Sequence, residues 1–222
     1  MPDLDFSIHS VEVKTYAVVP TLSFQLRIVN NVRNEEVYAA ALRCQVMIEA
    51  TKRQYDAEMK SALKEVFGEP SRWQETVRSL FWTTLTVPVP RFIDETVIEV
   101  PVGCYEDHLS AAGKYFFSAK NGEIPLAFLF SGTVFSKNEN DNVGISMVPW
   151  HKEAMYPMPV TVWQELMRTY FPHSRWLVLR NELFEKLYRI KAAGAYSSLE
   201  NCLENMVDAT LKKIAGKQPE TI

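Results

Sequence analysis

Residues 124–135, with the sequence IPLAFLFSGTVF, contain an almost continuous apolar run followed by a Ser-Gly step. The run is preceded by Asn121-Gly122, a dipeptide that favours tight hairpin turns. An apolar run of this length next to a turn signal is typical of a strand that is buried on both faces. We therefore predict a fully buried strand here and build the rest of the fold around it.

Shorter segments on the N-terminal side alternate apolar and polar residues. Residues 22–28 and 42–48 have apolar side chains at every second position, the pattern of a strand with one buried and one solvated face. Residues 6–13 give a third strand, and turn-rich segments at 16–20 and 30–35 join the three into a meander. Further strands are predicted at residues 82–89, 96–100, 115–119 and 143–148. About eight strands in this order predict an antiparallel β-sandwich.

Two parts of the chain have helical spacing instead. A helical insertion is predicted at about residues 55–80, where a capping-box pattern at 71–74 opens its second helix. Near the C-terminus, capping boxes at 161–164 and 197–200 and a cap at Asn181 predict three more helices.

These patterns together predict an α+β fold with two parts. The first, residues 1–151, is the β-sandwich domain with its helical insertion. The second, residues 157–216, is a C-terminal region of three helices that packs on the sandwich.

Composition excludes several classes of protein. With 47% hydrophobic and 23% charged residues, the chain has the composition of a globular protein, and its net charge of −3 argues against a nucleic-acid binder. No apolar run approaches the length of a membrane span, and the N-terminus lacks the pattern of a signal peptide. Three widely spaced cysteines suggest neither a disulfide framework nor a zinc ribbon. We expect a soluble, cytoplasmic protein.

Two cysteines are candidates for a chemical role. Cys104 and His108 could ligate a metal, but two soft ligands without a second cluster do not make a structural site, so no metal and no cofactor is predicted. Cys44 is in phase with the apolar positions of its strand, which predicts a buried, unreactive thiol. No set of residues has the spacing of a catalytic site, so no catalytic residue is predicted.

The most polar-aromatic segment is the junction formed by Trp150, His151, Lys152 and Glu153. His151 and Glu153 would act as an acid/base pair only if they shared a pocket. The favoured interpretation is a solvated linker in which Trp150 packs between the two parts of the chain. Likewise, Gly132 after the buried run is predicted to mark a β-bulge and not a phosphate loop, because no helix follows it.

Three other residues are candidates for contacts with a partner or ligand. Trp163 and Trp176 could be exposed anchors of an interface, or they could seal a helix onto a sheet. Arg180 could act in a ligand-binding or catalytic pocket between sandwich and helices, as could His151 and Glu153.

Several motifs in one order resemble an uncharacterised bacterial family, a domain of unknown function that is mainly actinobacterial. The motifs are LRCQVMIEA (42–50), FGEPSRW (67–73), GEIPLAFLFSGTVF (122–135), VPWHKEA (148–154), PVTVWQELM (159–167) and YFPHSRWLVLR (170–180), and the similarity extends to about Lys191. Genes of the family often lie beside nickel-iron hydrogenase genes, and the resemblance therefore implies an accessory or assembly role. It implies no active site.

The leading hypothesis is a noncatalytic accessory or interaction protein that docks a protein partner, in the assembly or regulation of a hydrogenase-type redox complex. The second is an enzyme or small-ligand-binding protein with a pocket between sandwich and helices. The third is a holdase-like chaperone that binds extended chain along a sheet edge.

Overall fold

The computed structural model describes residues 2–32, 35–104, 110–137, 143–174 and 179–215, and it divides into two compact units, Met1–Ser174 and Arg175–Ile222. The first unit holds the eight strands and the helices up to α5, and the second holds α6 and α7. The domain limits predicted above, 1–151 and 157–216, stay predictions.

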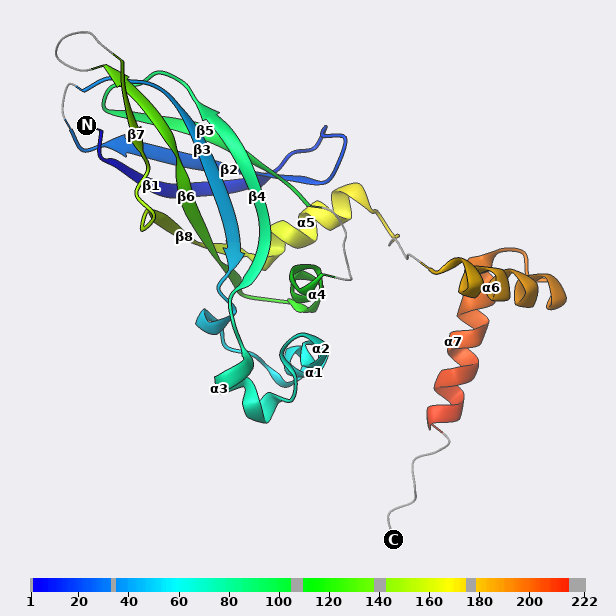
Figure 1. Cartoon of the computed structure of the whole chain (residues 1–222). Helices are drawn as coiled ribbons and strands as arrows, with labels where there is room; N and C mark the ends of the chain where they lie inside the picture. Colours follow the sequence, from blue (N-terminus) through cyan, green and yellow to red (C-terminus); the bar gives the residue numbers. More distant parts are fainter. Residues whose placement is uncertain (1, 33–34, 105–109, 138–142, 175–178, 216–222) are drawn as a thin grey trace. The chain divides into compact units, whose positions relative to one another are not determined.

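The first unit is built from two antiparallel sheets (Figure 1). The three-stranded sheet has the order β1-β2-β5, with β1 at Leu4–Val13, β2 at Thr21–Asn30 and β5 at Glu95–Gly103. The five-stranded sheet has the order β4-β3-β6-β7, with β8 also paired to β6; its strands are β3 (Val37–Ile48), β4 (Leu80–Val89), β6 (Glu123–Lys137), β7 (Val143–Met147) and β8 (Glu153–Pro159). The predicted α+β fold with an antiparallel sandwich of about eight strands is confirmed.

The apolar run at residues 124–135 lies at the centre of the larger sheet. Strand β6 pairs with β3 along one side, and with β8 and then β7 along the other. Its inward side chains meet those of the smaller sheet. Phe130 stacks on Phe6 with ring centroids 4.3 Å apart, and Phe128 meets Phe24 edge-on at 5.0 Å. All four rings are buried, so aromatic contacts across the two sheets form the middle of the core.

Gly132 does not mark a bulge, and that prediction is wrong. The register between β3 and β6 runs without a shift past Gly132, which pairs with Leu42. Its φ is +144°, and a Cβ placed there would lie 2.1 Å from the backbone oxygen of Ala41. Glycine is needed here because two backbones approach too closely for any side chain.

Two strand assignments also need correction. Residues 115–119 belong mainly to helix α4 (Ala111–Ser118), which begins where the Ser110 hydroxyl accepts the backbone N–H of Gly113. The adjacent side chains of Tyr115 and Phe116 are both buried, whereas the apolar Phe117 is 56% exposed, so apolar residues lie on both faces of the helix and hide its period. Strand β8 was not predicted, because Glu153 was placed in a solvated linker and the helical region was begun at residue 157. The two prolines of β8 are tolerated at the margin of the sheet.

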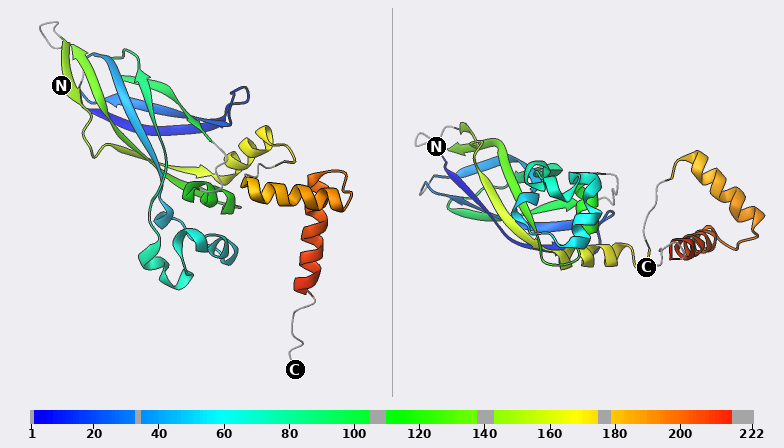
Figure 2. Two further views of the ribbon diagram at one scale, coloured as in Figure 1. Left: turned by 45° about the vertical axis from the view of Figure 1, so that its right-hand side comes forward. Right: turned by 90° about the horizontal axis from the view of Figure 1, so that it is seen from below.

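The predicted insertion consists of short helical turns: η1 (Ala50–Lys52), α1 (Ala57–Ala62), α2 (Lys64–Phe67), η2 (Pro70–Arg72) and α3 (Trp73–Thr76). It gathers with α4 at one end of the sandwich (Figures 1 and 2). Tyr55 holds the two together, because its hydroxyl lies 3.0 Å from that of Tyr115 and its ring meets Trp73 edge-on at 5.1 Å. The insertion is thus anchored by aromatic packing.

The capping boxes predicted at 71–74 and 161–164 do not form. Helices α3 and α5 (Val160–Tyr170) begin at Trp73 and Val160 without a side-chain cap. Ser71 lies within the 3-10 turn η2, and Gln164 donates to the Lys120 carbonyl at 2.9 Å instead of folding back on its own helix.

Over residues 179–215, the described part of the second unit, there are two helices, α6 (Asn181–Ala193) and α7 (Leu199–Ala215). The start of α7 is close to its predicted position, and Ser198 caps it by accepting the N–H of Asn201 at 3.0 Å. The three predicted C-terminal helices are therefore present, as α5, α6 and α7.

Candidate functional site

The Trp150 turn connects β7 to β8 and presents an aromatic side chain to solvent. Trp150 is 91% exposed and meets the ring of His151 edge-on, with centroids 5.9 Å apart. The Lys152 N–H donates to the Pro149 carbonyl at 3.1 Å, which closes the turn and leaves the indole outside. Trp150 is thus not packed within its own unit, and its predicted packing between sandwich and helices stays a prediction.

Lys152 forms ion pairs with two carboxylates, those of Asp3 and Asp5. Its Nζ lies 2.8 Å from the Oδ1 atoms of both Asp3 and Asp5, and Asn31 donates to the other oxygens of the same carboxylates. Hydrogen bonds from Lys152 lower the pKa of Asp3 and of Asp5, and those carboxylates in turn raise the pKa of Lys152. This network ties the chain after Trp150 to strand β1.

The structure does not join His151 and Glu153 as the acid/base pair that a shared pocket would require. His151 lies in the turn, whereas Glu153 opens strand β8; both are exposed, and no hydrogen bond joins them among the residues described. Arg180 lies in the second unit, where its carbonyl accepts the N–H groups of Leu183 and Phe184 at the start of α6. Trp176 lies outside the described residues.

Trp163 is a packing residue of the first unit. It is only 9% exposed and stacks on Phe116 with centroids 4.2 Å apart and an interplanar angle of 17°. Of its two predicted roles, the structure supports the one in which it seals helix α5 onto its neighbours.

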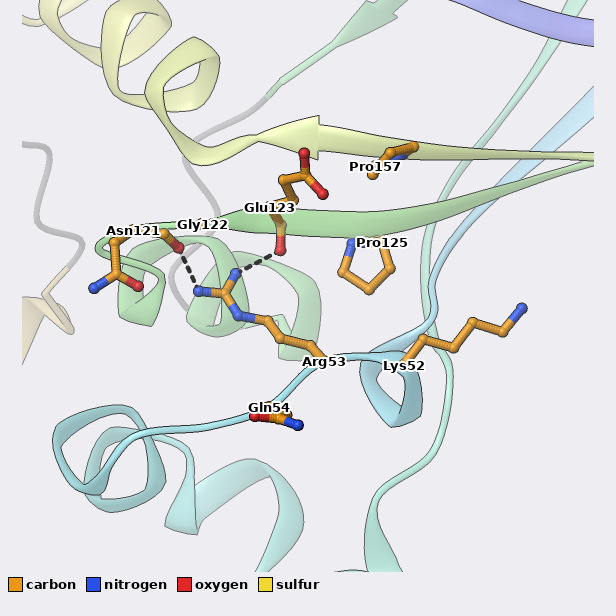
Figure 3. A pocket seen from close by; sticks show the side chains of 8 residues that line it. All are labelled: Lys52, Arg53, Gln54, Asn121, Gly122, Glu123, Pro125 and Pro157. Atoms are coloured by element: carbon orange, nitrogen blue, oxygen red, sulfur yellow. Dashed lines mark hydrogen bonds between the residues drawn. The ribbon is translucent and has the colours of Figure 1, made fainter.

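A hollow of about 340 Å³ lies between the segment after η1 and the start of β6 (Figure 3). It is lined by Lys52, Arg53, Gln54, Asn121, Gly122, Glu123, Pro125 and Pro157. The Arg53 guanidinium donates to the Glu123 carbonyl at 2.9 Å and to the Asn121 carbonyl at 2.5 Å. Arg53 therefore holds the turn before β6 in place, and none of the residues predicted for a pocket lines this hollow.

The three cysteines are free and buried. Burial raises the pKa of Cys44 and of Cys104 to about 12, and the Cys104 thiol lies 3.3 Å from the Val102 carbonyl oxygen. His108, its predicted metal-binding neighbour, lies outside the described residues. Within the described ranges, no group of three or more His, Cys, Asp or Glu residues could hold a metal ion.

We expect slow thiol labelling of the folded protein as a consequence. At pH 8, a thiolate-specific reagent should modify Cys44 and Cys104 in the folded protein at least tenfold more slowly than in urea. Both thiols are buried away from the reagent, and their raised pKa values keep them in the unreactive thiol form. Mass spectrometry of time points would assign each thiol. Rapid labelling of Cys44 in the native state would contradict the buried position.

The two sheets have different outer faces. On the smaller sheet, Lys14 pairs with Glu99, and Arg27 pairs with Glu95. On the larger sheet, β7 instead exposes Val143, Ile145 and Met147, each at least 60% exposed. The alternation of the sequence at 143–148 did predict this strand, but apolar residues in one phase are normally taken as the buried face. Here the buried face carries Gly144 and Ser146.

The second unit also exposes apolar side chains. Among its described side chains, Leu187 and Cys202 are the buried apolar residues, whereas eight others are 39–61% exposed. These are Leu183, Phe184, Tyr188 and Ile190 on α6, and Met206, Val207, Leu211 and Ile214 on α7. Two helices alone do not cover these eight side chains.

No helix within the described ranges combines the length and the apolar character that a membrane crossing requires.

Comparison with solved structures finds weak resemblances. The CARDB domain of the PF1109 protein from Pyrococcus furiosus, solved with di-metal ions, is 11% identical with a TM-score of 0.28, over 71% of this chain and 92% of that one. A candidate late embryogenesis abundant (LEA) protein is 10% identical with a TM-score of 0.30, over 71% and 74%. A β-glucosidase from Kluyveromyces marxianus has a TM-score of 0.25, is 9% identical, and matches over 71% of this chain and 15% of its own. Similarity this low supports no functional conclusion.

No curated protein matches the chain. One family model matches residues 1–215, a range that includes and extends the similarity predicted for 42–191. The resemblance to an uncharacterised family is thereby confirmed, while its bacterial distribution and hydrogenase context stay predictions. The protein belongs to a family of unknown function, DUF6084.

Proposed function

We propose that this protein is a noncatalytic accessory protein whose helices α6 and α7 dock a partner protein. The observation that supports this most is the set of eight exposed apolar side chains on these helices. A helix in a protein is stabilised mainly by burying its apolar stripe against another element. Helices α6 and α7 bury only two apolar side chains among those described, so most of this stabilisation would have to come from a further surface.

The pattern on α7 indicates what such a partner offers. Met206, Val207, Leu211 and Ile214 recur at the spacing of one helical face, while Asn205 and Lys212 lie on the opposite side. An amphipathic helix of this kind binds in an apolar groove through a few anchors at positions such as i, i+4 and i+7. The partner is therefore a protein with an apolar groove, and a subunit of a hydrogenase-type redox complex in the cytoplasm is the first candidate.

The test is purification of the full-length, tagged protein from its native host, followed by mass spectrometry. We expect the wild-type chain to enrich the same partner in repeated preparations, and Leu211→Lys to reduce that enrichment at least tenfold, because a charge placed in an apolar groove loses its solvation. Asn205→Lys adds the same charge on the opposite face of α7 and should retain the partner.

Two outcomes would overturn the proposal. Repeated recovery of the wild-type protein without any co-purifying protein would show that no stable partner exists. A fall in the melting temperature of the isolated Leu211→Lys protein, without a fall for Asn205→Lys, would mean that α7 is covered by the protein itself.

A further inference from the structure

The strands at the sheet margins differ in one respect that bears on self-association. A free edge offers unpaired N–H and C=O groups to other chains, and proteins usually protect such edges with prolines, charges or bulges. The margins of this sandwich are β1 and β5 in the smaller sheet, and β4, β7 and β8 in the larger.

Four of these five strands carry a protecting feature. Strand β1 has a register shift between Ile8 and Ser10, β5 contains Pro101, β4 contains Pro88, and β8 contains Pro157. Strand β7, with the sequence VGISM, has no proline and no charge, and it pairs with β6 without a shift. It also lies at the end of the sandwich opposite the helical insertion (Figure 1).

The hydrogen-bond pattern shows which groups of β7 face outward. The Val148 N–H donates to the Gly132 carbonyl at 2.9 Å, and in the register of the pair these two residues are directly opposed. In an antiparallel ladder such pairs alternate, so Gly144 and Ser146 also turn their backbone groups toward β6. The N–H and C=O groups of Val143, Ile145 and Met147 then point away from β6, at an edge that has no further strand among the residues that the structure describes.

The sequence of β7 is also complementary to itself. In an antiparallel pair centred on Ile145, Ile145 opposes its own copy, and Val143 opposes Met147. Every outward side chain meets an apolar counterpart, no like charges oppose each other, and about six backbone hydrogen bonds become possible. Such a pairing has two-fold symmetry and closes after two chains.

We propose that two copies of this protein associate through β7, in antiparallel register about Ile145, which joins their five-stranded sheets into one. The contact is a single short strand, so it forms a weak dimer that depends on protein concentration. This surface is independent of the helical surface of the proposed function.

Sedimentation velocity of the full-length protein from about 1 to about 300 µM tests the association. The wild type should shift from monomer toward dimer over this range. Ile145→Lys, which places two lysines opposite each other at the symmetry axis, should weaken dimerisation at least tenfold. Val97→Lys, at an exposed apolar position of β5, should behave as the wild type.

Cross-linking tests the register. In this pairing the Cα atoms of the two copies of residue 145 lie about 5.5 Å apart, within the range for a disulfide. Ile145→Cys should therefore form a covalent dimer under mild oxidation, and Val97→Cys should not. The native cysteines are buried, which limits background cross-linking.

A wild-type protein that stays monomeric throughout the range would overturn the proposal. So would a dimer that survives Ile145→Lys, assemblies larger than a dimer, or the absence of a cross-link in Ile145→Cys. A dimer lost in Leu211→Lys and retained in Ile145→Lys would assign self-association to α7 instead.

Discussion

Replacing Gly132 with alanine is expected to lower the free energy of unfolding by about 2–4 kcal/mol. Two costs combine at this position. The backbone φ of +144° is one that residues with a Cβ rarely adopt, and the added methyl group would lie 2.1 Å from the Ala41 carbonyl oxygen. The clash is with the backbone of the neighbouring strand, so no side-chain rotation can relieve it; strands β3 and β6 must separate.

Gly144→Ala is the matched control, because Gly144 lies on β7 of the same sheet. Its φ is not positive, and an added Cβ would lie 3.5 Å from the Ser136 hydroxyl, an ordinary contact. We expect a change within about 1 kcal/mol. Urea denaturation followed by tryptophan fluorescence would measure both variants. Equal stability of the two would show that β3 and β6 do not approach as closely as described.

Trp163→Ala is expected to lower the free energy of unfolding by about 3 kcal/mol, the usual cost of removing a large buried aromatic side chain. The indole is nearly buried and stacks on Phe116. The ring centroid of Phe116 in turn lies 4.6 Å from that of Trp82. Removing it leaves a cavity between α5, α4 and the sheet, and these elements can close it only by moving.

Trp150→Ala provides the comparison, because Trp150 is almost fully exposed. It should change stability by no more than about 0.5 kcal/mol. The comparison separates a packing role, expected for Trp163, from a surface role, expected for Trp150. Thermal unfolding of both variants decides it: a stable Trp163→Ala protein would mean that this ring is available to a ligand or partner.

Much of the fold could be predicted because apolar periodicity reports directly on burial. Alternation identified β2 and β3, and the continuous run identified β6. The same rule failed at Tyr115 and Phe116, since adjacent aromatic residues that are both buried fit a strand or a helix equally well. Strand β8 was also missed, because its first residue was interpreted as part of a linker, and its prolines do not exclude a strand at the margin of a sheet.

The candidate site was less predictable, because exposure depends on what covers a side chain and not on its type. Trp150 and Trp163 have the same chemistry and differ in exposure by a factor of ten. Val143 and Ile145 follow the pattern of core residues, yet they lie on the outer face. Their backbone orientation, from which the dimer was inferred, follows from the register with β6 and has no signature in sequence.

The order of the strands in the larger sheet has a consequence for synthesis on the ribosome. Residue Ile48 of β3 pairs with Leu126 of β6, 78 positions later (126 − 48). At about 5–20 residues per second, roughly 4–16 s pass between their emergence. During that interval β4 is the one strand of the larger sheet that can pair with β3. The other edge of β3 stays unpaired until β6 has been synthesised. The second edge of β3 can therefore be fully paired only after residue 137 has left the exit tunnel.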